Sequence, residues 1–259
     1  GGSSGLDNTT GRLNTFVGYN SGANNTTANS NTFMGESAGF TNTTGANNTA
    51  IGQAALVFNT TASNNTAVGY QAGYYTTTAN RLTAIGQFAG YGQATGAENT
   101  YVGYGSGPNT IANASGQFNT SLGAFSLYSN TTASNNTAVG YQAGYSNTTG
   151  ADMVAIGKAA LKLSTVGNGN TAVGNNALTA STTSSNNTAL GDNAGAANTT
   201  GANNTIIGKQ ALQANTTASN NTAVGYQAGY SNTTGTENTA AGYVSMYSNT
   251  TGNYNTAYG

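Results

Sequence analysis

Apolar, small and polar positions recur at every seventeenth position along almost the whole chain. Each period is marked by the glycine of a stretch such as NTAVG. These anchor glycines are Gly18, Gly35, Gly52, Gly69, Gly86, Gly103, Gly123, Gly140, Gly157, Gly174, Gly191, Gly208, Gly225, Gly242 and Gly259. The step from Gly103 to Gly123 is twenty positions instead of seventeen. Residues 1–259 therefore form one repeat array with a three-residue insertion.

Each position of the repeat forms a column with its own chemistry. The residue before the anchor is apolar, as in Val17, Met34 and Ile51. The third residue after the anchor is only Ala or Ser, and the fourth is Gly or a large aliphatic residue. Asn stands four residues before the anchor in thirteen of fifteen coils, Leu82 and Met153 being the exceptions. Thr follows that position in fourteen of fifteen coils.

This pattern predicts an all-β fold, a parallel β-solenoid or β-roll of about fifteen coils with seventeen residues per coil. One coil is too small to bury a core, so stacking must make the core continuous. We expect a short strand before the anchor, where glycine permits a tight bend. A second short strand is expected in YQAGY and a turn in SNTTG. The Asn and Thr columns are expected to form hydrogen-bonded ladders.

Two further expectations concern the array as a whole. The insertion between Gly103 and Gly123 should form a local bulge around Pro108. The repeat is in phase at both Gly1 and Gly259, and neither end carries the atypical coil that protects the open edge of a solenoid. We therefore expect residues 1–259 to be a window of a longer fibre, or the chains to stack end to end.

The composition disfavours several functional classes. With net charge −1, five basic residues and no basic patch, the chain is not expected to bind nucleic acid. No apolar run approaches the roughly 18 residues typical of a transmembrane helix, and no signal peptide is recognisable, so no membrane insertion is expected in this segment. The chain has no His and no Cys and no carboxylate cluster. We therefore expect no metal, no cofactor and no catalytic residue, and we predict that the protein is not an enzyme.

The stretch NTAVGYQAGYSNTTG resembles two related repeat families. One is the head repeat of trimeric autotransporter adhesins, and the other is the similar repeat of phage tail fibres and tail-fibre-like bacterial proteins. The resemblance covers almost the whole chain. It implies a left-handed β-roll, three chains wound about one axis, and a role in reaching or gripping a surface. The seventeen-residue period is longer than the usual adhesin head repeat, so the turn is expected to be larger.

Pattern and resemblance together favour an extracellular structural fibre segment. It would be the shaft or head of an adhesin or tail fibre, located at the cell surface or on a virion, and it would present a repetitive surface for attachment. Its expected partner is itself, as a homotrimer or an end-to-end homopolymer, with cell-surface glycans as a further partner. One alternative is a self-assembling, glycosylated extracellular filament. A second alternative is a glycan-binding module.

Tyrosines are the candidate recognition residues, because stripes of Tyr can stack on sugars. Twelve of the sixteen tyrosines occupy two columns, directly after the anchor and five residues after it. The candidates for surface recognition are Tyr19, Tyr70, Tyr104, Tyr141, Tyr226, Tyr243, Tyr74, Tyr145 and Tyr230. The competing interpretation is that these rings pack against neighbouring coils or chains, where aromatic pairs add ~0.5–1.5 kcal/mol each.

Asparagines of the NTT turns fit the N-x-[ST] pattern of glycosylation acceptors. The candidates are Asn25, Asn42, Asn59, Asn130, Asn147, Asn198, Asn215, Asn232 and Asn249. The competing interpretation is that Asn and Thr simply make good turns and ladders. Charged residues are scattered, but Arg81 and Glu98 lie on neighbouring coils and are expected to form an exposed ion pair worth ~0–1 kcal/mol.

Overall fold

Each coil of the chain carries one short strand. A computed structural model describes residues 2–109 and 113–259, in which no helix is found, and all statements below concern these residues. The chain divides into two compact units, Gly1–Ala133 and Ser134–Gly259. The first unit contains β1 Thr15–Val17, β2 Thr32–Met34, β3 Thr49–Ile51, β4 Thr66–Val68, β5 Thr83–Ile85, β6 Thr100–Val102 and β7 Thr120–Leu122. The second contains β8 Thr137–Val139, β9 Val154–Ile156, β10 Thr171–Val173, β11 Thr188–Leu190, β12 Thr205–Ile207, β13 Thr222–Val224, β14 Thr239–Ala241 and β15 Thr256–Tyr258.

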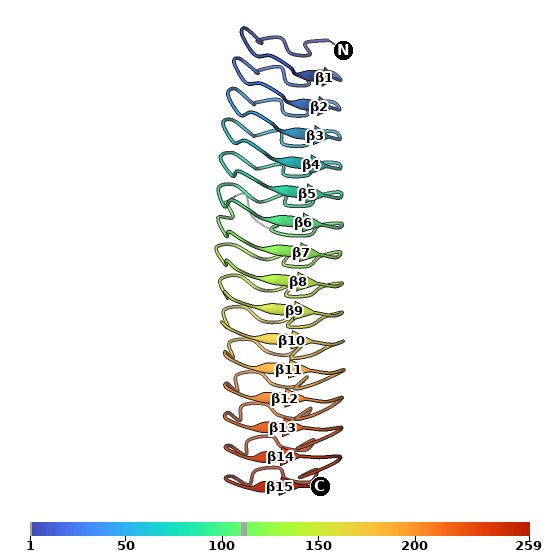
Figure 1. The fold of residues 1–259 in the computed structure, drawn as a ribbon, viewed down its shortest axis with the longest axis vertical. Coiled ribbons are helices and arrows are strands. Elements are labelled where there is room, and N and C mark those ends of the chain that lie inside the picture. Colours follow the sequence, from blue (N-terminus) through green and yellow to red (C-terminus); the bar gives the residue numbers. More distant parts are fainter. Residues whose placement is uncertain (1, 110–112) are drawn as a thin grey trace. The chain divides into compact units, whose positions relative to one another are not determined.

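Within each unit, every strand pairs in parallel with the strand of the next coil (Figure 1). The register follows the repeat: Thr49 pairs with Thr66 in the first unit, and Thr188 with Thr205 in the second. Equivalent residues therefore lie one above another. The predicted parallel β-solenoid with seventeen residues per coil is confirmed.

The segment after the anchor is not a strand, so the expectation of a second strand in YQAGY was wrong. Two of its positions, the second and fourth after the anchor, adopt positive φ, as Gln71 (53°) and Gly73 (60°) show. An extended strand requires negative φ at every residue. The backbone still bonds from coil to coil here, since Gly73 N donates to Ala89 O at 2.9 Å. Turns thus replace the second strand while the backbone continues to pair between coils.

The anchor glycine is required by both its conformation and its surroundings. Gly69 has φ of 135°, and a Cβ there would lie 2.5 Å from the carbonyl oxygen of Gly86 in the next coil. No L side chain fits that approach. The tight bend expected at this position is confirmed.

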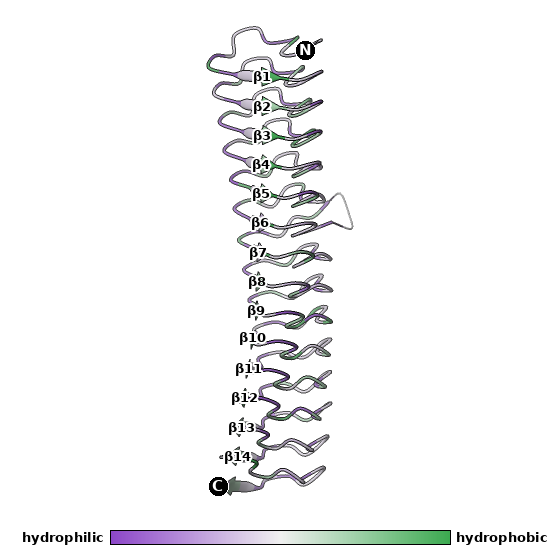
Figure 2. Cartoon of the chain, turned by 90° about the vertical axis from the view of Figure 1, so that its right-hand side faces the viewer, coloured by the Kyte–Doolittle hydropathy of each residue, from purple (hydrophilic) through white to green (hydrophobic). Residues whose placement is uncertain are grey.

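The core is formed by the column two residues before the anchor, and not by the apolar column directly before it. In β3, Ala50 is fully buried whereas Ile51 is 38% exposed, because successive residues of a strand point to opposite faces. The inward column is mostly Ala, and it packs against the Ala or Ser and the Gly or Leu that follow the anchor. In β1–β4 the ribbon changes from pale at the start of the strand to green towards its end (Figure 2).

In some coils the bulk of the inward strand residue is matched by the size of the fourth residue after the anchor. Where the inward strand residue is large, as in Phe33, the fourth residue after the anchor is Gly39, and a Cβ there would lie 2.5 Å from the Phe33 ring. Where the strand residue is Ala50, the same position holds Leu56. Leu82 replaces an Asn of the column before the strand, is almost fully buried, and lies beside Gly73, where it adds bulk to a coil of small residues.

Two columns of buried asparagine form the predicted ladders. Asn42 Nδ2 donates to Asn25 Oδ1 of the preceding coil at 3.0 Å and to Gly45 O at 3.0 Å. In the second column, Asn31 Oδ1 accepts from the backbone nitrogen of Asn48 at 2.8 Å. Outside them, Thr side chains donate to the next coil's backbone. The amide ladders satisfy polar groups at bends where strand pairing has ended.

The three-residue insertion leaves the strand register intact. Thr100 of β6 still pairs with Thr120 of β7, as equivalent threonines do in the coils without an insertion. Gly92 N donates to Pro108 O at 2.8 Å, which ties the longer coil to its neighbour. The predicted bulge around Pro108 includes residues 110–112, which lie outside the described residues.

Candidate functional site

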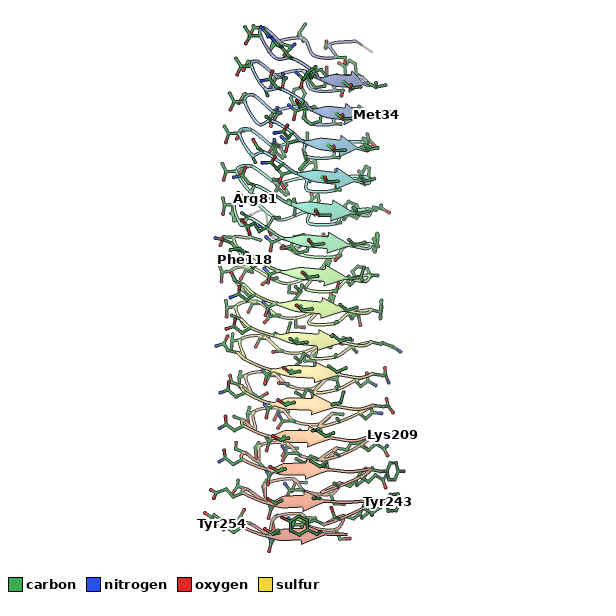
Figure 3. All side chains as sticks on the ribbon, in the orientation of Figure 1. Met34, Arg81, Phe118, Lys209, Tyr243 and Tyr254 are labelled. Carbon is green, nitrogen blue, oxygen red and sulfur yellow. The ribbon has the colours of Figure 1, made fainter. Side chains whose placement is uncertain are left out.

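The candidate tyrosines fall into two groups by exposure. The column directly after the anchor is exposed, from 39% at Tyr226 to 74% at Tyr243, and Tyr243 projects outward in Figure 3. The exposed members are Tyr19, Tyr70, Tyr104, Tyr141, Tyr226 and Tyr243. Tyr74, Tyr145 and Tyr230 of the other column are half-buried. In the second unit Tyr226 stacks on Tyr243 with ring centroids 5.4 Å apart.

Nine aromatic side chains of the first unit form a continuous cluster: Phe58, Tyr70, Tyr74, Tyr75, Phe88, Tyr91, Tyr104, Phe125 and Tyr128. At one end Phe58 stacks on Tyr75 with centroids 5.5 Å apart and planes 5° apart. Tyr75 meets Tyr91 edge-on at 5.1 Å, and Tyr91 lies 5.8 Å from Phe88. The rings of this cluster pack on neighbouring coils, and some of them also face solvent. Recognition of sugars by the tyrosines stays a prediction.

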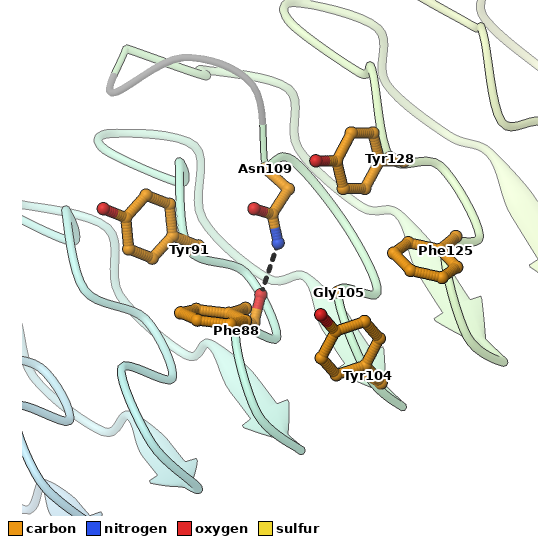
Figure 4. Close-up of a pocket in the computed structure, with 7 residues that line it drawn as sticks. All are labelled: Phe88, Tyr91, Tyr104, Gly105, Asn109, Phe125 and Tyr128. Atoms are coloured by element: carbon orange, nitrogen blue, oxygen red, sulfur yellow. Dashed lines mark hydrogen bonds between the residues drawn. The ribbon is translucent and has the colours of Figure 1, made fainter.

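Five rings of this cluster form what we call the aromatic arc: Tyr91, Phe88, Tyr104, Phe125 and Tyr128. Consecutive rings are in contact, with centroid distances of 5.8, 6.1, 5.0 and 5.6 Å along that order. The arc lines a partly open cavity of about 290 Å³ whose lining also includes Gly105 and Asn109 (Figure 4). This volume lies just below the range of drug-sized ligand pockets, roughly 300–1,000 Å³.

The cavity exists because one coil lacks a side chain where its neighbours carry a phenyl ring. Phe88, Gly105 and Phe125 are successive members of the second column after the anchor. A Cβ on Gly105 would already lie 3.2 Å from the Phe125 ring and 3.5 Å from Asn109 Nδ2. Glycine thus opens a slot between two aromatic walls.

Asn109 of the longer coil is fixed at the side of this slot. Its backbone nitrogen donates to Tyr128 O at 3.0 Å, and its Nδ2 donates to Phe88 O at 2.9 Å (Figure 4). The residue thus bridges the coils on both sides of its own. Its carbonyl oxygen Oδ1 belongs to a rigidly placed amide beside the cavity.

Burial sets the ionisation of two tyrosines. Partial burial, a side-chain hydrogen bond with Tyr75 and the neighbouring phenols raise the pKa of Tyr91 to about 12. Complete burial raises the pKa of Tyr101 well above its ordinary value, and its hydroxyl donates to Gln93 Oε1 at 2.9 Å. Both hydroxyl groups are therefore protonated donors at neutral pH.

The candidate glycosylation asparagines are turned inward. Eight of the nine are at most 2% exposed, and Asn249 is half-buried; the eight are Asn25, Asn42, Asn59, Asn130, Asn147, Asn198, Asn215 and Asn232. A glycan would occupy Nδ2, which in Asn42 and Asn59 already donates to the ladder. The folded coils therefore disfavour attachment at these positions.

The charged columns lie on the outside of the coils. Arg81 forms an ion pair with Glu98 while both side chains remain exposed, which confirms the prediction. Sequence reasoning missed a second neighbouring pair, Asp192 and Lys209, whose charged atoms are 4.0 Å apart. Each of these residues directly follows an anchor glycine, and the two anchors are successive, so the repeat spacing alone would have identified the pair.

The sequence interpretation also missed Phe88, Phe125, Gly105 and Asn109. The signal was present for the two rings, because the second column after the anchor is aromatic only at Phe88 and Phe125. Asn109 carried no such signal, since the insertion removes it from the columns.

A second cavity of about 440 Å³ also lies in the first unit, and it is lined by Thr41, Phe58, Thr60, Tyr75, Thr77, Ala94, Thr95 and Asn113. The described residues offer little metal or membrane chemistry. They contain no group of three or more Asp, Glu, His or Cys side chains placed to hold a metal ion. In the same residues no helix has the length and apolar character needed to span a membrane. The chain matches no family model, no curated protein and no solved structure.

Proposed function

We propose that this chain is a segment of an extracellular structural fibre that presents a repetitive surface for attachment at a cell surface or on a virion. The observation that carries the proposal is the repeated coil: one strand and one outward position recur in every coil, and the two amide ladders recur in most coils of each unit. Such a fold supplies length and a repeated surface. Repetition of the same side chains on successive coils suits attachment at many points at once.

The outward aliphatic column supports self-association as part of this function. We call it the aliphatic stripe, and its most exposed members are Val17, Met34, Ile51, Ile85, Leu122, Ile156, Leu190, Ile207 and Val224. Their exposure ranges from 36% to 51%. An apolar surface that recurs on every coil is typical of an interaction face. A second copy of the chain presents the same stripe with the same spacing, so we propose a homotrimer, as the family resemblance implies.

The native mass of the purified chain tests this proposal. A trimer has three times the 25.7 kDa mass of one chain. Light scattering after size exclusion should give that threefold value. A stable 25.7 kDa monomer at all concentrations would contradict the trimeric fibre, and open-ended polymers would favour the self-assembling filament.

A further inference from the structure

We propose that the aromatic arc and its cavity bind one neutral pyranose residue of a glycan. The site rests on the proposed attachment function for its biological use, but its chemistry belongs to a single chain. All seven lining residues come from the first unit, and none of them carries a charge.

The walls suit the faces of a sugar ring. One face of a pyranose presents C–H groups that stack on aromatic rings, and Phe88 and Phe125 offer such rings on either side of Gly105. Tyr104 contacts both of these rings, at 6.1 and 5.0 Å. The arc is therefore braced by its own ring contacts before a ligand enters, which lowers the ordering cost of binding.

The polar groups of the site match hydroxyl groups. Tyr104 and Tyr128 each carry a phenol that can both donate and accept hydrogen bonds, whereas the hydroxyl of Tyr91 is already hydrogen-bonded to Tyr75. Asn109 adds an amide whose position is fixed by its bond to Phe88 O. A polyhydroxylated ligand can exchange hydrogen bonds with these groups, whereas a purely apolar ligand would displace their water without replacing its bonds.

The absence of charge among the lining residues selects against ionic ligands. A phosphate, sulfate or carboxylate placed in this cavity would lose water without gaining a cationic partner from them. A cation would likewise meet no carboxylate among these residues. The ligand class is therefore a neutral hexose or N-acetylhexosamine.

The test measures binding of the full chain to the methyl glycosides of glucose, galactose, mannose and N-acetylglucosamine. Saturation-transfer NMR and calorimetry would follow each glycoside, with p-cresol as a flat aromatic comparison. We expect at least one glycoside to bind with a Kd of roughly 1 mM or tighter. Binding of p-cresol without binding of any glycoside would overturn the proposal, and so would no binding at all.

Two variants test whether the glycoside binds in the cavity. Gly105→Gln should fill the slot, and Phe88→Gln should remove one wall. Gln71 already occupies this column with φ of 53°, so the backbone admits both changes. The Phe125 ring, 3.2 Å from a Cβ on Gly105, has to shift by about a few tenths of an ångström. Each should weaken glycoside binding by about tenfold or more.

The matched control is Tyr226→Gln in the second unit, an exposed ring outside the arc. It should change affinity by less than about twofold. Undiminished binding by Gly105→Gln would overturn the assignment of binding to the cavity. An equal loss of affinity in Tyr226→Gln would also overturn it and would assign binding to the tyrosine columns. Because these measurements do not depend on chain number, a monomeric mass would contradict the fibre proposal while leaving this one intact.

Discussion

At the scale of single residues, the core is governed by space more than by hydropathy. The inward strand column is mostly Ala, and a large residue such as Phe33 occurs opposite a glycine. Interiors packed to this density leave no room for an added side chain. The coil of Ile206 and Leu212 carries two large buried residues, but in the coils of Phe33 and Ala50 a large residue at one position is matched by a small one at the other.

This balance predicts a compensating pair of substitutions. Gly39→Leu should destabilise the chain by about 1–3 kcal/mol through crowding of Phe33. Phe33→Ala should also destabilise it, by about 3–5 kcal/mol, because it leaves a cavity. The double variant recreates the Ala50 and Leu56 pair of the next coil and should be less destabilised than the sum of the two. Urea unfolding of all four chains measures the coupling, and strict additivity would show that the two positions do not compensate.

The buried amide ladder makes a second prediction at this scale. Asn42→Asp replaces a donor to Asn25 and Gly45 with an acceptor, and should cost more than about 2 kcal/mol at neutral pH. Burial raises the pKa of the introduced carboxyl in the folded state. The folded state of this variant is then most stable below about pH 4, where the carboxyl is protonated, and loses stability as the pH rises through the folded pKa. The penalty relative to the wild type should therefore shrink on acidification.

The control for that prediction is present in the chain. Ser164 and Ser181 occupy the same column and are fully buried, so Asn42→Ser should be milder and insensitive to pH over this range. Urea midpoints for both variants at acid and neutral pH would decide the matter. Equal penalties at all pH values would mean that the introduced carboxyl reaches solvent.

Tyr91 gives a prediction for alkaline conditions. Its folded pKa of about 12 lies above its ordinary value of 10, so its contribution to stability is complete below pH 10 and is lost as pH rises from 10 to 12. The wild type should therefore lose stability more steeply than Tyr91→Phe between these limits. Unfolding midpoints at the two pH values measure this difference. Parallel losses would assign the alkaline transition to other groups such as Tyr101.

At the scale of the element, the repeat is the unit of structure, and the sequence was a good guide to it. Spacing alone located the strands, because an in-register parallel sheet must repeat with the coil. Spacing could not show which side of a strand faces inward. In Thr49–Ile51 the more hydrophobic residue, Ile51, points outward, and the inward Ala50 shares the core with Leu56.

The sequence analysis also misassigned the segment after the anchor and missed the aromatic cavity, because both depend on local backbone and space. The segment YQAGY alternates like a strand, but positive φ at Gln71 and Gly73 turns it into successive bends. The aromatic cavity depends on the missing side chain of Gly105 and on Asn109, which the insertion brings beside it. Asn109 has no equivalent in the other coils, so the repeat pattern carries no information about it.

If each coil is one structural repeat, deletion of a whole coil should leave the rest of the chain folded. Deleting residues 208–224 joins Ile207 to Gly225 and keeps every column in phase. The shortened chain should retain its β circular dichroism and unfold within about 4 °C of the parent.

The control deletion removes residues 208–225, one residue more. It places Tyr226 at an anchor, and a Cβ at the anchor Gly225 would lie 2.2 Å from Gly242 O. This chain should be markedly less stable. Equal stability of the two deletions would show that the anchor and the phase do not matter.

At the scale of the whole molecule, the aliphatic stripe should control assembly without controlling folding. Ile51→Lys combined with Ile85→Lys changes two outward side chains, 38% and 40% exposed, and should convert the assembly to 25.7 kDa monomers that keep their circular dichroism. The control, Gln53→Lys with Gln87→Lys, alters the column in which Lys158 occurs naturally. It should leave the native mass unchanged. An unchanged mass in the stripe variant would move the interface to another face.

The longer coil between β6 and β7 meets two structural demands separately. The pairing of these strands is unaffected by the three added residues, while the same coil supplies Asn109 to the aromatic cavity. In the fibre that we propose, a substitution at Asn109 would therefore change the lining of the cavity while the pairing of β6 with β7 is kept. Ligand preference and coil stacking could then vary independently of each other at this coil.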